Sequence, residues 1–143
     1  MISERTLRLT LLATAVYHVA TGMLALADPG TFFEQIGRYG IENQHYVGDV
    51  GSFQLASGVA LLIAAGRPSW RVPVLGFLAI WYGLHALNHA FDTGQARSDE
   101  RGVLDTILLA GGALFAAWLA RVSARLGGSS GSTRSPSPPR ASA

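Results

Sequence analysis

The sequence predicts an all-α membrane protein, a four-transmembrane-helix bundle, and two observations carry this prediction. Only 14% of its 143 residues are charged, whereas about one quarter of the residues in an ordinary soluble domain are charged. The uncharged residues also gather in four stretches, each near the length of about 20 residues that crosses a bilayer core. These stretches are residues 9–27, 50–66, 72–91 and 106–120.

Charged or helix-breaking residues bound each predicted span. The first span follows Arg5 and stops before Asp28, and the second ends at Arg67. Pro73 lies in the first turn of the third span, where a missing backbone N–H costs little. The predicted spans are about residues 6–27, 46–66, 71–91 and 102–121.

The segment that joins the first two spans is too polar to cross a membrane. Asp28 is expected to cap a short helix with Pro29 at its first position. Phe32, Phe33 and Ile36 would then lie on one side of this helix, as in a helix that rests at the membrane interface.

The C-terminal segment and the end of the first span affect how the chain is divided into a membrane domain and other parts. Residues 127–143 are mainly Gly, Ser, Pro and Arg, so we expect a membrane domain over 1–126 followed by a disordered cytoplasmic tail. The run 25–27 (ALA) resembles a signal-peptide cleavage site, which would leave three spans. We favour an uncleaved span, because the apolar stretch exceeds the usual length of about 7–15 residues.

The distribution of Arg predicts the orientation. All basic residues are Arg, and eight would lie on the side of the termini against three on the other side. The positive-inside rule therefore puts both termini in the cytoplasm. Since the Arg residues flank the spans, we expect no nucleic-acid partner despite a pI near 9.5. The eight are Arg5, Arg8, Arg67, Arg71, Arg121, Arg125, Arg134 and Arg140, and the three are Arg38, Arg97 and Arg101.

Two spans carry faces of small residues. Helices in lipid pack closely through such faces, so we expect these two to contact protein as well as lipid. The contact could be within the bundle or with a second copy of the chain. The faces are Gly48, Ser52, Ala56, Ala60 and Ala64 in the second span, and Gly111, Gly112, Ala116 and Ala120 in the fourth.

Polar side chains inside the spans are the main functional signal. Ionisable groups at membrane depth are costly, so each needs a partner or a task. In the predicted topology they share the outer half of the membrane, with His85 about 10 Å and His18 about 13 Å below the outer surface. This coincidence predicts one shared network or site. Its members are His18, His45, Asp49, His85, Asn88, His89, Asp92 and Asp105.

This cluster has a structural and a functional interpretation. Structurally, Asp49 and Asp105 could each cap the start of a span, and His18 could tie helices together. Functionally, His85 and His89 lie one turn apart and could share a divalent metal, which Asp49 or Asp105 would complete. Two of His18, His85 and His89 could instead bind a haem cofactor. Both interpretations stay open.

The sequence lacks the motifs of several enzyme classes that use such polar side chains. There is no cysteine, no pair of Glu-x-x-His motifs, no Gly-rich phosphate loop and no Gly-x-Ser-x-Gly. Four histidines are too few for the His boxes of membrane desaturases. Trp81 and Tyr82 fit packing aromatics better than a quinone clamp. The absence of these motifs favours a protein that is not an enzyme, and the sequence alone leaves the question open.

Three short motifs carry a family resemblance. They are segment 43–51 (NQHYVGDVG), segment 58–62 (GVALL) and His85-x-x-x-His89. Together they resemble small four-helix membrane proteins of high-GC Gram-positive bacteria, which are DoxX-like in architecture. The resemblance covers about residues 5–122 and implies the fold and the membrane location. DoxX-like members are associated with redox and thiol stress, but a chain without cysteine could not itself exchange thiols.

We therefore predict a multi-pass protein of the inner (cytoplasmic) membrane, in contact with the lipid bilayer. The first hypothesis is a non-catalytic membrane subunit or scaffold, in which the buried network holds the bundle together. The second is a metal- or haem-binding redox or stress component. The third and least favoured is a proton-linked carrier that works as a homo-oligomer. A homo-oligomer or a membrane partner protein is compatible with the small-residue faces.

Overall fold

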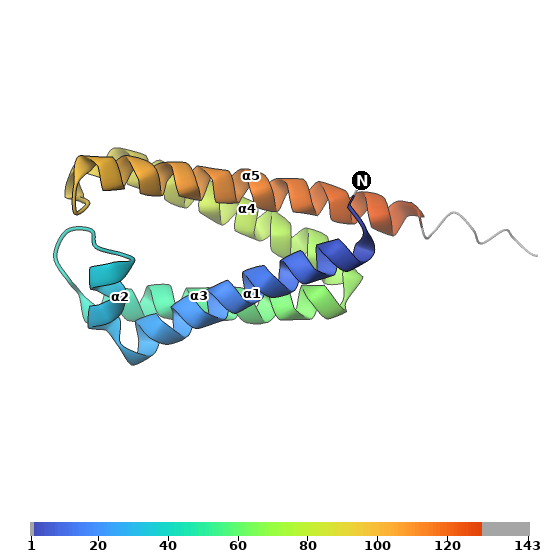
Figure 1. Cartoon of the computed structure of the whole chain (residues 1–143), viewed down its shortest axis with the longest axis horizontal. Helices are drawn as coiled ribbons and strands as arrows, with labels where there is room; N and C mark the ends of the chain where they lie inside the picture. The colour runs from blue at the N-terminus through green and yellow to red at the C-terminus, as the bar shows by residue number, and fades with distance from the viewer. Residues whose placement is uncertain (1, 130–143) are drawn as a thin grey trace, which may run out of the picture.

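A computed structural model of the chain, which describes residues 2–129, confirms the all-α four-helix prediction (Figure 1). Its four long helices are each long and apolar enough to cross a membrane. The protein is therefore a multi-pass membrane protein by length and composition. The elements are α1 (Glu4–Ala27), α2 (Pro29–Gln35), α3 (Gln44–Gly66), α4 (Pro68–Phe91), the 3₁₀ turn η1 (Thr93–Gln95) and α5 (Asp99–Ser129).

The helices extend beyond the apolar spans, most of all in α5. That helix continues to Ser129, whereas the predicted span ended near residue 121. The reason is that hydropathy marks the lipid-crossing part of a helix, while Arg, Ala and Leu remain good helix formers in water. Residues 127–129 of the predicted tail therefore belong to α5. The rest of that tail, residues 130–143, lies outside the described residues.

Helix α2 forms as the sequence predicts. The Asp28 carboxylate accepts the backbone N–H of Thr31 at 3.0 Å, and Pro29 occupies the first helical position. Hydrogen bonding from the Thr31 side chain, and then from its backbone N–H, lowers the pKa of Asp28. Phe32 and Phe33 are buried in a small cluster with residues of α1 and α3. The short helix is thereby fixed against one end of the bundle.

The four long helices form two closely packed pairs, α1 with α3 and α4 with α5 (Figure 1). Glycines allow the backbones of the first pair to meet. A Cβ added to Gly22 would lie 2.6 Å from the backbone nitrogen of Leu55, and one added to Gly58 would lie 2.9 Å from that of Val19. Both positions thus exclude any larger residue.

The predicted small face of α3 is only partly used inside the bundle, since Ala60 and Ala64 pack in the core while the part nearer the loop end does not. Ser52 and Ala56 are exposed, and nothing lies within 4 Å of a Cβ at Gly48. The contact with α1 uses Gly51 and Gly58, which lie two helical turns apart. The spacing of small residues predicted which side of α3 would allow close packing. The closest contact between the α1 and α3 backbones instead lies at Gly51 and Gly58.

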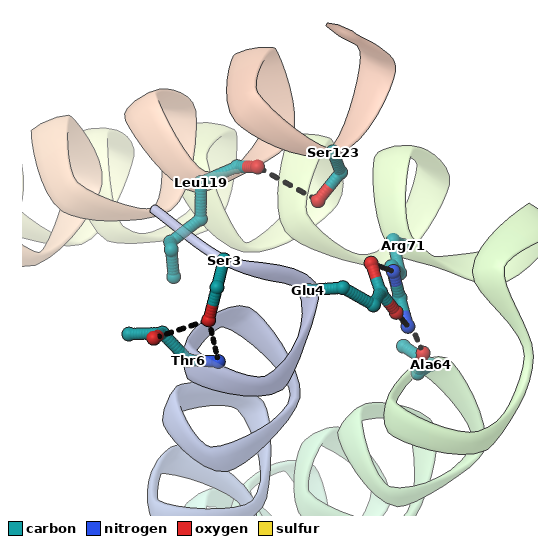
Figure 2. A network of polar contacts seen from close by, with 7 residues as sticks. All are labelled: Ser3, Glu4, Thr6, Ala64, Arg71, Leu119 and Ser123. Carbon is teal, nitrogen blue, oxygen red and sulfur yellow. Dashed lines mark hydrogen bonds and ion pairs between the residues drawn. The ribbon is translucent and has the colours of Figure 1, made fainter. Parts of the chain in front are cut away.

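The two pairs meet where α3 turns into α4, and Figure 2 shows this end of the bundle. The Arg71 guanidinium donates to both carboxylate oxygens of Glu4 at 2.9 and 2.6 Å, and its Nε donates to the Ala64 carbonyl at 3.2 Å. Arg71 is only 4% exposed. We call this the ion-pair end. The large buried side chains nearby are Leu7, Leu11, Leu61, Leu75, Leu78 and Leu119.

The pairs diverge toward the opposite end, which carries α2 and η1 and which we call the loop end (Figure 1). There the connection after α2 reaches across to η1. The Gly40 N–H donates to the Gln95 carbonyl at 2.9 Å, and Tyr39 forms an isolated bridge with Ala96. Gly40 has a φ of 59°, which a residue without a Cβ adopts without strain.

Candidate functional site

A cavity of about 420 Å³ lies between the two helix pairs at the loop end. This volume is within the range of about 300–1,000 Å³ that is usual for small-molecule sites. All five α-helices contribute to its wall, together with the connection after α2. Among its lining residues are Tyr17, Phe32, Tyr39, Tyr46, Gln54, Trp81, Tyr82, His85, His89, Asp92, Arg101 and Asp105.

His18 joins three helices beside this cavity and is fully buried. Its Nδ1 lies 2.5 Å from Oε1 of Gln54 on α3, and its Nε2 lies 2.9 Å from Oη of Tyr82 on α4. Because the amide oxygen can only accept, Nδ1 donates, and the bare Nε2 of the neutral ring then accepts from the Tyr82 hydroxyl. Both ring nitrogens of His18 are therefore occupied by protein groups.

His85 and His89 meet on the cavity wall, as their spacing predicts. Their Nε2 atoms are 2.9 Å apart, so one imidazole donates its N–H to the other. The Tyr39 ring lies over His89 with the ring centres 4.3 Å apart. Within the described residues, Nδ1 of His89 and Oη of Tyr39 are buried without a hydrogen-bond partner. These two atoms are the unsatisfied polar groups of the cavity wall.

Charged groups line the cavity toward α5 and η1. Nε of Arg101 contacts the Asp105 carboxylate at 3.0 Å, and the Asp92 carboxylate accepts from Nε2 of Gln95 at 3.1 Å. Asp105 lies in the second turn of α5, because the helix begins at Asp99. It is therefore an ion-pair partner within the helix, and the capping role that the structural interpretation allowed for it does not apply.

Asp49 lies apart from the other predicted ligands. Its carboxylate is exposed and faces the equally exposed His45, with Nε2 and Oδ2 3.7 Å apart. On α3 the cavity wall is formed by Tyr46, Val47, Val50 and Gln54, and helical geometry turns Asp49 to the other side. The capping role predicted for Asp49 also falls to another residue, because Asn43 caps α3.

The predicted metal set of His85, His89, Asp49 and Asp105 is thus not assembled. In the described part of the chain, no group of three or more His, Cys, Asp or Glu side chains is placed to hold a metal. His85 and His89 do come together, and Asp105 lines the same cavity. As for the predicted haem ligands, His18 already uses both ring nitrogens, which leaves only the His85 and His89 pair.

Three polar members of this site were not predicted from the sequence. Gln54 could have been recognised, since it is the amide in the middle of an apolar span. Tyr82 was assigned to packing, and it does pack on Trp81, but its hydroxyl also bonds to His18. Tyr39 lies in a connection, and no periodic pattern places a loop residue over His89. Trp81 stacks on Phe53 with ring centres 4.3 Å apart, as a packing aromatic does.

No family model, curated protein or solved structure matches the chain. The resemblance to DoxX-like proteins therefore rests on the short motifs alone and stays a prediction. The geometry of the helices and the cavity is therefore the basis for inferring the function.

Proposed function

We propose that the protein is a non-catalytic subunit or scaffold of the inner (cytoplasmic) membrane, with both termini in the cytoplasm. The observation that carries this proposal is the position of His18, whose two nitrogens bind partners on two other helices. A polar side chain used in this way holds helices together in lipid. The His and Asp side chains of the loop end would then lie in the outer half of the membrane.

The Arg distribution supports this sidedness. Arg5, Arg8, Arg67 and Arg121 belong to the ion-pair end of the bundle by their places in the helices. Arg71 also lies there but forms an ion pair with Glu4. Even without Arg71, the ion-pair end has more Arg residues than the loop end. The positive-inside rule places the more basic end in the cytoplasm.

The outer surface of the bundle supports a role in assembly. On α4, Ile80, Leu84 and Leu87 are exposed, which fits contact with lipid or with an apolar partner helix. On α3, Ser52 and Ala56 are exposed, and no described residue lies within 4 Å of a Cβ at Gly48. This part of the small face would admit a close helix. A second copy or another membrane protein would supply that helix.

Purification in mild detergent, followed by mass measurement of the native particle, tests the proposal. The expected result is an assembly of several copies, or of this chain with another membrane protein. Ala56→Leu should weaken the assembly, whereas Ala110→Leu, the same change at an exposed position of α5, is the matched control. A particle that is monomeric at all protein concentrations and has no partner would contradict the proposal.

A second candidate function is the binding of a metal or haem by His85 and His89. The observation in its favour is that these two imidazoles contact one another on the wall of a cavity that also contains Asp105. Purified protein should then show a Soret band or a stoichiometric divalent metal, and His85→Ala and His89→Ala should abolish it. Colourless, metal-free protein purified from its own host would contradict this candidate.

A further inference from the structure

We propose that the cavity at the loop end binds a neutral lipid-like alcohol, with its hydroxyl between Tyr39 and His89 and its hydrocarbon chain along the apolar wall. This inference adds a ligand to the structural role proposed above and does not depend on it. It rests on the unsatisfied polar atoms of the wall, on the charges around them and on the exposed rim.

The two unsatisfied atoms define the polar end of the site. Oη of Tyr39 and Nδ1 of His89 are buried without a partner within the described residues, and their rings are 4.3 Å apart at the centres. Nε2 of His89 is already engaged by His85. A buried polar atom without a partner is costly. Both residues line the cavity, so a small shift of either side chain would turn these buried atoms toward a molecule bound there.

The chemistry of these two atoms favours a hydroxyl group. Nδ1 of His89 is a donor in one tautomer and an acceptor in the other, and the Tyr39 hydroxyl can play either part. A hydroxyl can donate to one partner while it accepts from the other. It therefore satisfies both atoms whichever His89 nitrogen carries the proton, which a carbonyl or an ether oxygen cannot do.

The charges of the wall argue against an anionic head group. The charged lining comprises Asp92, Asp105 and Arg101, which leaves one excess negative charge with the histidines neutral. Arg101 is already paired with Asp105, so the described lining has no free cationic side chain that could bind an anionic head group. Asp92 accepts a hydrogen bond from Gln95 and is partly exposed, so solvent screens its charge and weakens its attraction for a cationic head group. A neutral head group is the best match.

The rim of the cavity gives a hydrocarbon chain a route to lipid. Tyr17 on α1, Tyr46 on α3 and Leu108 on α5 line the cavity and are 55%, 67% and 61% exposed. The wall therefore continues into the apolar outer surface of three helices. A chain that leaves the cavity over these residues would pass directly into the bilayer, which supplies such molecules.

Equilibrium binding of tritiated 1-dodecanol to the full-length protein in nanodiscs tests the proposal. The expected result is saturable binding of one molecule per chain, after subtraction of partition into empty nanodiscs. Unlabelled dodecane, dodecanoate and dodecylamine should compete at least about tenfold more weakly than dodecanol. Tyr39→Phe should weaken binding about fivefold, the loss expected for one hydrogen bond.

Two controls separate loss of the site from loss of the fold. Ser69→Ala removes an exposed hydroxyl at the opposite end of the bundle, outside the cavity, and should leave the affinity unchanged. The melting temperature of ligand-free Tyr39→Phe should equal or exceed that of the wild type, because the hydroxyl it loses has no partner among residues 2–129. A mere structural role for Tyr39 would lower it.

Four results would overturn the proposal. They are binding that never saturates, dodecane that competes as well as dodecanol, a preference for dodecylamine or dodecanoate, and undiminished binding by Tyr39→Phe. The last result would mean that water alone occupies the polar end. None of these outcomes bears on whether the chain assembles with partners, so the failure of this inference is distinct from failure of the proposed function.

Discussion

Arg71 donates two hydrogen bonds to the Glu4 carboxylate, and this ion pair connects the first turn of α4 to the first turn of α1 (Figure 2). The guanidinium also holds the Ala64 carbonyl in the last turn of α3, where helical carbonyls lack partners. One buried side chain thus connects three helices at the ion-pair end, as His18 does farther along the bundle.

Loss of the Glu4 charge should weaken the ion-pair end. Glu4→Gln leaves the buried guanidinium without its carboxylate and should lower the free energy of unfolding by about 1–3 kcal/mol. The matched control is Glu34→Gln, because Glu34 pairs with Arg38 on the surface and such a pair contributes about 0–1 kcal/mol. Unfolding in mixed micelles measures both. Equal effects of the two substitutions would contradict the role of Glu4 as the partner of the buried Arg71.

Removal of His18 should destabilise the bundle strongly. His18→Ala leaves a cavity and strips Gln54 and Tyr82 of their partner, so we expect a loss of about 2–4 kcal/mol. His45→Ala is the control, since His45 is exposed on α3 and should change stability by less than about 0.5 kcal/mol. The same unfolding assay compares them. If the two variants unfold alike, His18 does not tie the helices.

The close approach of α1 and α3 should not tolerate a methyl group at Gly22. A Cβ there would lie 2.6 Å from a backbone nitrogen, so Gly22→Ala should cost about 1–3 kcal/mol or more through overpacking. Gly48→Ala meets open space and should gain about 0.5–1 kcal/mol from reduced backbone entropy. Thermal unfolding of the pair measures the contrast. A gain at both positions would show that the two backbones are farther apart.

Stability should fall at high pH because of Tyr39. Burial, with a contribution from Asp105, raises the pKa of Tyr39 above its ordinary value of 10.0. Above about pH 10 the unfolded chain releases the phenol proton while the folded chain retains it. The stability present below that pH is therefore lost as pH rises, and Tyr39→Phe lacks this part of the loss. Unfolding curves of the two proteins from pH 8 to pH 11 should diverge above pH 10, and parallel curves would contradict the shift.

Features set by local spacing were predictable from the sequence. Hydropathy located all four long helices, because a span of hydrocarbon demands about 20 apolar residues. Asp28 and Pro29 predicted the start of α2, since capping involves neighbours in the chain. The contact between His85 and His89 followed from a separation of one helical turn.

Features set by tertiary contact were not predictable in the same way. The rotation of α3 that exposes Asp49 depends on which glycines meet α1, and no pattern within α3 alone determines it. The partner of Arg71 lies 67 positions away in the chain. Tyr39 reaches His89 only because the loop after α2 pairs with η1. These relationships arise when elements dock, so a single span carries no signal for them.

Cysteine labelling tests the membrane arrangement most directly, because the chain has no cysteine of its own. Gly94→Cys in η1 and Ser69→Cys at the start of α4 introduce one exposed thiol each at opposite ends of the bundle. A membrane-impermeant maleimide applied to intact cells should label Gly94→Cys, and should label Ser69→Cys only after the membrane is permeabilised. Labelling of Ser69→Cys in intact cells, or recovery of either variant in the soluble fraction, would contradict the account.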